Sequence, residues 1–219
     1  MFYLLTGGSA CGKSTYAESL VCRYGQPRIY IATMQPYGEE SLAKIDRHRR
    51  MRAQKGFATI EAQTNIADVE VPADASVLLE CICNLTSNEM FDAQGNMCDP
   101  RHKIVEGVLG LAQRCRNLVV VTNDVGSEFH DYDDLTPKYV DALGYINREL
   151  AAKADAVFEL VCGIPIVMKG ELPMVDGGEF AAADLEHPMG GASLVSYSSR
   201  AAGAAAQSAA LQNARSEAV

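Results

Sequence analysis

The sequence lacks two features that would place the protein in a membrane or outside the cell. None of its apolar runs approaches the roughly 18 consecutive residues that a membrane-spanning helix needs. Residues 1–5 are apolar, but this run is too short and too uncharged at its start for a secretory signal. We therefore expect a cytoplasmic protein without a membrane span.

An excess of basic residues is also missing. The 219 residues include 19 Lys and Arg against 28 Asp and Glu, so the net charge is −9 and the pI is near 4.9. Such a chain repels phosphate backbones, which argues against binding nucleic acid over a wide surface, and any anion site must be local. Apolar residues make up 48% and charged residues 21%, which excludes a fibrous or wholly disordered chain and fits one globular domain.

The cysteines do not indicate a disulfide framework. Seven cysteines are an odd number, and without a secretory signal we expect them to be reduced and mostly buried. Cys81 and Cys83 could suggest zinc, but no second Cys or His pair follows at finger-like spacing. Two residues apart on a strand they would share a face, so core cysteines are favoured. His102 and His130 are interpreted as surface residues, and His187 lies in a glycine-rich tail.

Apolar, β-rich runs alternate with helix-like segments up to about residue 170. We expect strands at residues 2–6, 28–33, 57–61, 76–82 and 117–124, with one or two more within 156–168, and helices at 13–23, 39–54, 100–115 and 137–154. The continuous apolar runs are typical of strands buried on both faces of a parallel sheet. The alternation predicts a layered α/β fold, a predominantly parallel sheet flanked by crossover helices.

The composition changes after about Gly170. Glycines interrupt the chain at several positions, no β-rich run follows, and from residue 201 it is mostly Ala, Ser and Gln. An Ala-rich stretch with few large apolar residues has little surface to bury. The expected organisation is one domain at residues 1–170 and a mobile Gly-rich, then Ala/Ser-rich tail at 171–219.

The strongest motif follows the first expected strand. Its residues fit the P-loop pattern G-x-x-x-x-G-K-[ST] and are Gly7, Gly8, Ser9, Ala10, Cys11, Gly12, Lys13 and Ser14. The glycines let successive backbone N–H groups point at phosphate oxygens, and the helix that follows adds its positive end. Lys13 would reach the β and γ phosphates, and the Ser14 hydroxyl would bind Mg²⁺. The motif predicts a purine nucleoside triphosphate site.

A P-loop needs an acidic partner for Mg²⁺ on a neighbouring strand. Glu80, near the end of the run at 76–82, is placed for this role, and Asp124 after the run at 117–124 is the rival. We expect Ser14 and Glu80 to hold the metal. Both carboxylates also remain candidates for the general base of a phosphoryl transfer, because spacing alone assigns none.

A basic cluster, RHRRMR, occupies residues 47–52 of this acidic chain. Such a run is often the solvated face of a helix. Beside a P-loop it has a second use, because a triphosphate needs further cations and arginine forks pair with phosphate oxygens. The surrounding positive charges disfavour an imidazolium, so His48 could act as a neutral nucleophile toward phosphorus.

Several motifs in order carry a resemblance to a known family. They are TGGSACGKST (6–15), YIAT (30–33), KIDRHRRMR (44–52), ATIE (58–61), LLECI (78–82), VVVTNDVG (119–126), INRELAAKAD (146–155) and VCGIPIVMKG (161–170). Over about residues 1–170 the chain resembles the bifunctional adenosylcobinamide kinase and adenosylcobinamide-phosphate guanylyltransferases of cobalamin assembly. It departs from their pattern at Ala53, where they have Pro, at Phe57, which takes the place of their Trp, and at Asp124, where Glu is commoner. The spacing from His48 to Glu61 is also one residue longer.

The resemblance implies a RecA-like P-loop fold, a homotrimer and two activities. One is phosphorylation of the aminopropanol hydroxyl of adenosylcobinamide by ATP or GTP, and the other is transfer of GMP from GTP to that phosphate. His48 matches the histidine that becomes guanylylated. The positions that match nucleotide-binding residues are the P-loop at 7–14, Ala32, Thr33, Met34, Arg49, Arg50, Met51, Arg52, Glu61 and Glu80.

Two other functions fit parts of the pattern. A small-molecule kinase could use the P-loop and treat residues 47–52 as a lid that clamps phosphates. A nucleotide-dependent regulatory or assembly protein would hydrolyse nucleotide to drive a switch and would form no cobinamide product.

Overall fold

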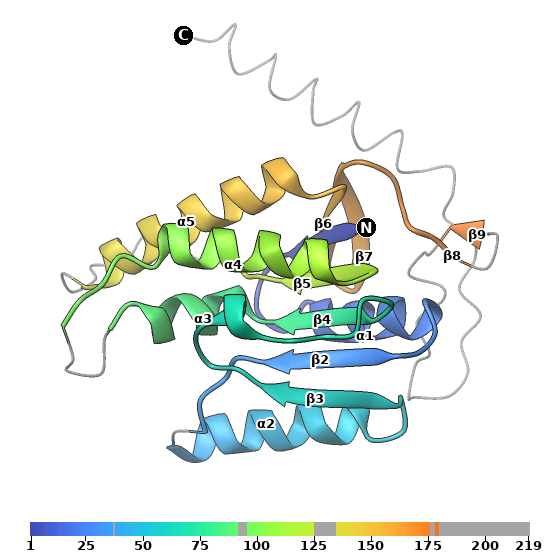
Figure 1. Ribbon diagram of the computed structural model, residues 1–219, viewed down its shortest axis with the longest axis horizontal. Helices are drawn as coiled ribbons and strands as arrows, with labels where there is room; N and C mark the ends of the chain where they lie inside the picture. The colour runs from blue at the N-terminus through green and yellow to red at the C-terminus, as the bar shows by residue number, and fades with distance from the viewer. Residues whose placement is uncertain (37, 92–95, 125–134, 176–177, 180–219) are drawn as a thin grey trace, which may run out of the picture. The chain divides into compact units, whose positions relative to one another are not determined.

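Seven strands form one sheet in the order β3-β2-β4-β5-β1-β6-β7 in the computed structural model of the chain (Figure 1). They are β1 (Phe2–Thr6), β2 (Arg28–Ala32), β3 (Phe57–Glu61), β4 (Ser76–Glu80), β5 (Asn117–Val121), β6 (Ala156–Val161) and β7 (Ile164–Lys169). Every neighbouring pair is parallel except β6 and β7, which are antiparallel. The structure describes residues 1–36, 38–91, 96–124, 135–175 and 178–179.

Helices cover both faces of this sheet. They are α1 (Lys13–Arg23), α2 (Gly38–Arg52), α3 (Ile82–Glu89), α4 (Arg101–Arg114) and α5 (Leu135–Lys153), with a short 3-10 turn at Ile66–Asp68. In Figure 1, α4 and α5 lie together over one face, and α2 lies beside β3 at the edge. The expected layered α/β fold class, with a predominantly parallel sheet between helices, is confirmed.

The core has two parts because alternate residues of each strand point to opposite faces. Phe2 and Leu4 of β1 pack with residues of α4 and α5, whereas Tyr3 and Leu5 pack with residues of α1. β5 is buried along its whole length. The continuous apolar runs therefore lie in the middle of the sheet, as two covered faces require.

Helix α3 was missed in the sequence. The strand expected at 76–82 ends at Glu80, and Ile82 already begins the helix. Ile82, Leu85 and Glu89 are buried at the spacing of one helix face, and the short apolar segment hides this period inside what looks like a longer strand. Cys81 and Cys83 therefore do not share the face of a strand, and that part of the interpretation is wrong.

The expectation that most cysteines are buried is also wrong. Two are buried (Cys83, Cys115), three are partly buried (Cys11, Cys22, Cys81) and two are exposed (Cys98, Cys162). The exposed pair lies in irregular chain, before α4 and at the turn between β6 and β7. Position in the fold, rather than residue type, decides their burial.

The late part of the chain forms more strands than the sequence indicates. Two strands flank Gly163, whose φ of 81° suits the tight turn between them. Past Gly170, where no β-rich run was expected, two short strands pair with each other, β8 (Met174–Val175) and β9 (Gly178–Glu179). Leu172 packs against the core on the α1 side. The tail at 180–219 lies outside the described residues, and the division at residue 170 stays a prediction.

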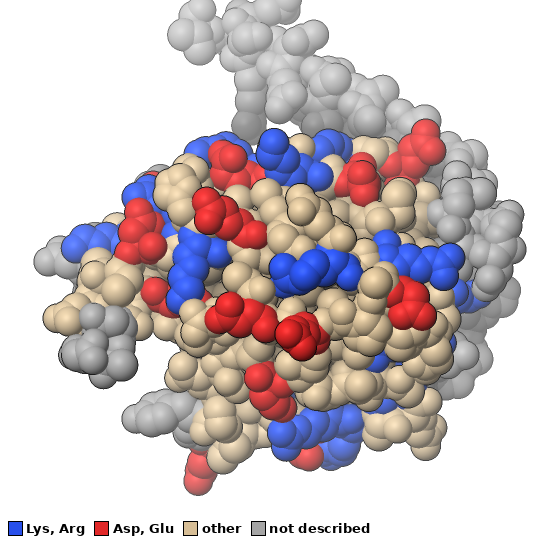
Figure 2. All heavy atoms as spheres, in the orientation of Figure 1, with Lys and Arg blue, Asp and Glu red and all other residues tan. Residues whose placement is uncertain are grey.

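Charged side chains are mixed on the surface that can be viewed. Figure 2 shows basic and acidic side chains interspersed over one face, without a continuous basic area. Among the described helices, none combines the length and the apolar character that crossing a membrane requires.

A buried ion pair and an arginine join the C-terminal end of α2 to α1. Lys55, in the turn after α2, donates to the Glu18 carboxylate at 2.7 Å, and the Glu18 side chain is fully buried. Arg28 of β2 donates to the carbonyl oxygens of Cys22 and Lys55, each at 2.7 Å. Burial raises the pKa of Glu18, and the Lys55 ammonium opposes that rise. The Lys55–Glu18 ion pair and the hydrogen bonds of Arg28 therefore hold the C-terminal end of α2 against α1.

We predict that Lys55→Met destabilises the fold in a pH-dependent way. Burial raises the pKa of Glu18 in the folded state above its value in the unfolded state. As the pH rises from the unfolded-state pKa to the folded-state pKa, the folded protein therefore loses stability. Removing Lys55 raises the folded-state pKa of Glu18 further. The loss of stability should therefore be about 3 kcal/mol at neutral pH, the low end for a broken buried pair, and smaller at mildly acidic pH.

Urea unfolding at both pH values measures this difference. The matched control is Arg50→Met, which breaks the exposed pair with Asp46 on the same helix and should change stability by less than about 0.5 kcal/mol. An equal loss for Lys55→Met at the two pH values would contradict the prediction.

Candidate active site

The loop between β1 and α1 is shaped by two glycines. Gly7 has a φ of 138°, and a Cβ placed there would lie 2.6 Å from the Leu160 carbonyl oxygen. Gly12 has a φ of 99°, and its Cβ would lie 3.0 Å from Gly163. L-residues avoid these backbone conformations, and the neighbouring chain leaves no room for a side chain. Glycine at both positions lets the loop lie against β6 and the turn that follows it.

The two polar residues that end the loop are already oriented. The Lys13 side chain is buried, and its Nζ donates to the carbonyl oxygens of Gly7 at 2.8 Å and Gly8 at 2.5 Å. The Ser14 hydroxyl donates to the Glu80 carboxylate at Oε1. The loop thus carries a positive charge at its centre and a hydroxyl next to an acid, the two groups expected from the motif.

Glu80 reaches the loop from β4, with β5 lying between β4 and β1. The carboxyl ends of parallel strands meet at one edge of a sheet, which brings these distant segments together. Its second oxygen, Oε2, accepts a hydrogen bond from the Tyr30 hydroxyl of β2 at 3.0 Å. Burial, and after it the charge of Glu80, raises the pKa of Tyr30 well above its usual range. The phenol therefore stays protonated and donates to the carboxylate.

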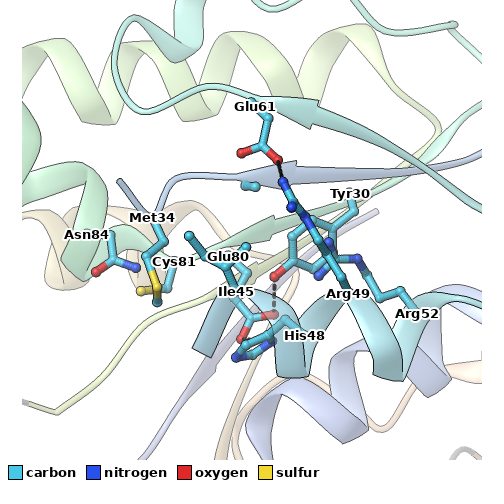
Figure 3. Close-up of a pocket in the computed structure, with 11 residues that line it drawn as sticks. Tyr30, Met34, Ile45, His48, Arg49, Arg52, Glu61, Glu80, Cys81 and Asn84 are labelled. Carbon is cyan, nitrogen blue, oxygen red and sulfur yellow. Dashed lines mark hydrogen bonds and ion pairs between the residues drawn. The ribbon is translucent and has the colours of Figure 1, made fainter. Parts of the chain in front are cut away.

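His48 and Arg52 reach the same place from α2. The two residues lie four apart and so share a helix face. His48 Nδ1 lies 3.9 Å from Glu80 Oε1, and the Arg52 guanidinium lies 3.5 Å from the centre of the Tyr30 ring. Figure 3 shows Tyr30 and His48 on opposite sides of the Glu80 carboxylate. The P-loop, the acid and the histidine thus form one continuous site.

The pocket around this site includes several other residues that the sequence singled out. Those lining it are Tyr30, Ala32, Met34, Ile45, His48, Arg49, Arg52, Glu61, Glu80, Cys81 and Asn84. Arg49 contacts Glu61 at 3.3 Å across the pocket mouth, where both side chains are largely exposed. Such an exposed pair is weak and can open for a ligand.

Eleven of the seventeen expected nucleotide-binding positions are not among the described residues that line this pocket, namely the eight P-loop residues at 7–14, Thr33, Arg50 and Met51. Of the P-loop residues, Ser14 reaches the pocket only through its hydrogen bond to Glu80. Arg50 pairs with Asp46 and is exposed. Thr33 is buried and bonds the backbone of Cys81, with its Oγ1 donating to the carbonyl at 2.9 Å and accepting from the amide at 2.7 Å. Ser9 is exposed on the loop, and Met51 lies within α2, where only its backbone is described.

Among the other candidates, Asp124 is exposed and does not line the pocket, so Glu80 is the carboxylate that meets the P-loop. His102 is exposed on α4, against the Tyr145 ring. His130 and His187 lie outside the described residues.

Sequence reasoning missed the part played by Tyr30 and by Asn84. Tyr30 and Ala32 alternate with Ile31, so they share the face toward α1 and α2, which was a usable signal. Asn84 belongs to α3, the helix that was read as strand.

The thiols of Cys81 and Cys83 lie on either side of the start of α3. A hydrogen bond between them lowers the pKa of Cys83 and raises that of Cys81. The Asn123 amide also donates to the Cys83 sulfur, which favours its thiolate.

The family model for "Cobinamide kinase / cobinamide phosphate guanyltransferase" matches residues 3–168, which is most of the described chain. The chain belongs to this family.

Three named relatives of this family member agree with the match. The "Bifunctional adenosylcobalamin biosynthesis protein CobU" of Escherichia coli K12 and that of Salmonella typhimurium LT2 are each 32% identical over 184 residues, covering 77% of this chain and 100% of the relative. The "Bifunctional adenosylcobalamin biosynthesis protein CobP" of Pseudomonas aeruginosa PAO1 is 29% identical over 172 residues, covering 77% of this chain and 97% of the relative. The family resemblance expected from the motifs is confirmed, and the P-loop, Glu80 and His48 all lie within the matched region.

We predict that Gly7→Ala abolishes most nucleotide binding by this family member. The added methyl group would meet Leu160 and Cys11 within 3 Å, in a backbone conformation that L-residues avoid, so the loop must move. The affinity for a fluorescent GTP analogue should fall at least tenfold, which corresponds to about 1.4 kcal/mol.

Gly144→Ala in α5 is the matched control, because a methyl group there meets no atom within 4 Å. It should bind the analogue like the wild type. Wild-type affinity in Gly7→Ala would show that the loop geometry is not required.

Proposed function

We propose that the protein phosphorylates adenosylcobinamide and then guanylylates the product at a single nucleotide site. The observation that carries this proposal is the position of Glu80 Oε1, which accepts a hydrogen bond from Ser14 of the P-loop and lies 3.9 Å from His48 Nδ1. A phosphate-binding loop and a nucleophile candidate that share one carboxylate can act on the same bound nucleotide. Family membership supplies the two reactions.

In the kinase reaction, the γ-phosphoryl group of ATP or GTP passes to the aminopropanol hydroxyl of adenosylcobinamide. Such a transfer depends on positioning and on neutralising charge rather than on covalent chemistry by the protein. The backbone N–H groups of residues 7–14 would hold the β and γ phosphates, and Lys13 would exchange its carbonyl partners for phosphate oxygens. Arg49 and Arg52 add positive charge beside the pocket.

The residues fit Mg²⁺. Ser14 Oγ and a Glu80 oxygen lie in hydrogen-bond contact, and hydroxyl and carboxylate oxygens are the ligands that Mg²⁺ takes together with substrate phosphates. Bound there, Mg²⁺ would neutralise charge on the phosphate oxygens. Among the described residues no group of three His, Cys, Asp or Glu side chains forms a metal site, so phosphate oxygens of the nucleotide and water would complete the coordination.

In the guanylyl transfer, His48 attacks the α phosphorus of GTP and pyrophosphate leaves. The phosphate of adenosylcobinamide phosphate then attacks the same phosphorus and releases His48, which yields adenosylcobinamide-GDP. A covalent histidine intermediate divides the transfer into two displacements. Three observations support this role for His48: its place at the pocket, its low exposure and the neighbouring carboxylate. The use of ATP and GTP agrees with a cytoplasmic location.

We predict that GTP labelled at the α phosphate, with Mg²⁺, leaves an acid-labile, base-stable label on denatured wild-type protein. His48→Ala should show none, because the nucleophile is gone. His102→Ala is the matched control, since His102 is exposed on α4 away from the pocket, and it should label like the wild type.

The labelling experiment, together with assays of cobinamide phosphorylation and GTP hydrolysis, separates the alternatives. A wild-type protein that binds GTP and phosphorylates cobinamide but takes up no label would be a P-loop kinase in which residues 47–52 act as a lid. A protein that hydrolyses GTP with neither label nor cobinamide product would be a nucleotide-dependent switch. Either result would overturn the guanylyltransferase half of the proposal.

We also propose that the protein is a homotrimer, as the resemblance implies. Support for association comes from β7 at the edge of the sheet, where Ile164, Ile166 and Met168 are exposed although apolar. Exposed apolar groups of this size often mark an interface between chains.

We predict that Ile166→Lys lowers the mass measured by light scattering after size exclusion. Leu42→Lys, at an exposed apolar position on α2, is the control and should leave the mass unchanged. A wild-type monomer would contradict the trimer.

A further inference from the structure

The pocket beside His48 is too small for the second substrate that the proposed function requires. Its cavity has a volume of about 60 Å³. Cavities that enclose a small molecule are usually about 300–1,000 Å³. The hydroxyl-bearing arm of adenosylcobinamide could enter this pocket, but its macrocycle needs another surface.

A cavity of about 510 Å³, the α3–α5 cavity, lies between the end of α3 and the first turns of α4 and α5. Its apolar lining comes from Met90, Met97, Pro100, Pro137 and Ala142. Met97 is 40% exposed, and Phe91, which forms a β-bridge with Met97, is 44% exposed. Apolar side chains that the fold leaves uncovered in this way are typical of a ligand-binding surface.

The charged groups of the α3–α5 cavity balance one another. Arg101 donates to the Asp99 carboxylate at 2.7 Å and to the Asp141 carboxylate at 3.3 Å. With two carboxylates bound to it, this guanidinium offers no surplus positive charge to a phosphate. The remaining lone pairs of the carboxylates, and Lys138 in the same lining, can still bond to neutral amide groups. The cavity therefore suits a ligand that has both apolar faces and amide groups.

The α3–α5 cavity lies at the same edge of the sheet as the P-loop. Helix α3 starts just beyond the carboxyl end of β4, and α4 leads into the start of β5, so its first turn points back toward that edge. In Figure 1 the end of α3 and the first turns of α4 and α5 lie on the left, the side to which the arrows of β2 and β4 point.

The distance along α3 fits the length of the acceptor. The helix begins two residues after Glu80 and has eight residues, so its far end lies about 12 Å from its start. An aminopropanol arm with its amide link has the length of two extended residues, about 7 Å. The radius of the macrocycle adds to this reach. A macrocycle held at the end of α3 can therefore bring its hydroxyl to the P-loop.

We propose that the α3–α5 cavity holds the corrinoid macrocycle and that the hydroxyl-bearing arm extends along α3 to the P-loop. The apolar face of the macrocycle would lie on Met90 and Met97, and the amides at its rim would bond to Lys138 and Asp141. This inference rests on the proposed function and adds the place of the acceptor to it. Nucleotide and acceptor then bind at separate places and meet at the P-loop.

Another cavity, of about 570 Å³, is the competing place for the macrocycle. It follows β3 and is lined by residues 60–65 and 68–70. Three of these are the acids Glu61, Asp68 and Glu70, and most of the others are polar. This lining offers a macrocycle less apolar contact than the α3–α5 cavity does, so the tests compare the two.

The first test uses Cys98, an exposed residue that lines the α3–α5 cavity. Adenosylcobinamide is added to the wild type with Mg²⁺ and a non-hydrolysable ATP analogue, and its binding is measured by equilibrium dialysis. Alkylation of each cysteine by iodoacetamide is then followed by mass spectrometry. With about 90% of the sites filled, alkylation of Cys98 should slow about tenfold. The exposed Cys162, at the turn between β6 and β7, should be unaffected. Bound corrinoid without protection of Cys98 would overturn the inference.

The second test changes the lining. Met97→Arg places a longer, charged side chain against the macrocycle, and its 40% exposure should let the variant fold. The KM for adenosylcobinamide in the kinase reaction should rise about tenfold, a loss of about 1.4 kcal/mol in binding. The KM for ATP should not change, because the P-loop is not touched. If Met97→Arg does not fold, Lys138→Glu, at an exposed position of the same lining, takes its place.

Glu70→Arg is the matched control, because it adds the same side chain at an exposed position in the competing cavity. It should keep the wild-type KM for adenosylcobinamide. A KM that rises in Glu70→Arg and not in Met97→Arg would overturn the inference and leave the proposed function intact. A wild type that neither binds nor phosphorylates adenosylcobinamide would overturn the proposed function, and the acceptor site with it.

Discussion

The site depends on one carboxylate at the end of a central strand. Glu80 is held by Tyr30 from β2 and Ser14 from α1, and it faces His48 from α2. Three consecutive elements of the first 52 residues therefore meet at a single charge that β4 supplies. Because that charge lies where water screens it poorly, each partner gains more from it than an exposed pair would. Under the proposed function, a nucleotide would enter a site in which the P-loop, the carboxylate and the histidine are already oriented toward one another.

Much of the fold could be predicted because its central strands are buried on both faces. β1 and α1 begin and end where the apolar run and the glycines of the loop indicate. The exposed edge strand β3 also has the predicted bounds, which its β-rich residues indicate. Helix α3 could not be separated from the preceding strand, since its eight residues continue the apolar run and are too few for a helical period to stand out. The strand order also depends on contacts between distant segments, which no local pattern contains.

The motifs of the site could be predicted from the sequence, but the contacts between its side chains could not. The pattern around Lys13 requires a phosphate loop, and family motifs single out His48 and Glu80, but the sequence does not say that these two side chains face each other. Tyr30 carries no motif of its own, and its role appears only when strand order brings β2 beside β4. Glu18, a charge within a helix, looks like a surface residue until the fold buries it against Lys55.

The central claim is that one nucleotide serves both the P-loop and His48. A crystal structure of the His48→Asn variant with GTP and Mg²⁺ tests it most directly, since this variant should bind the nucleotide without attacking it. The account predicts the β and γ phosphates on the N–H groups of residues 7–14 and the α phosphorus facing residue 48. An α phosphorus turned away from residue 48, or a nucleotide bound apart from Glu80, would contradict it.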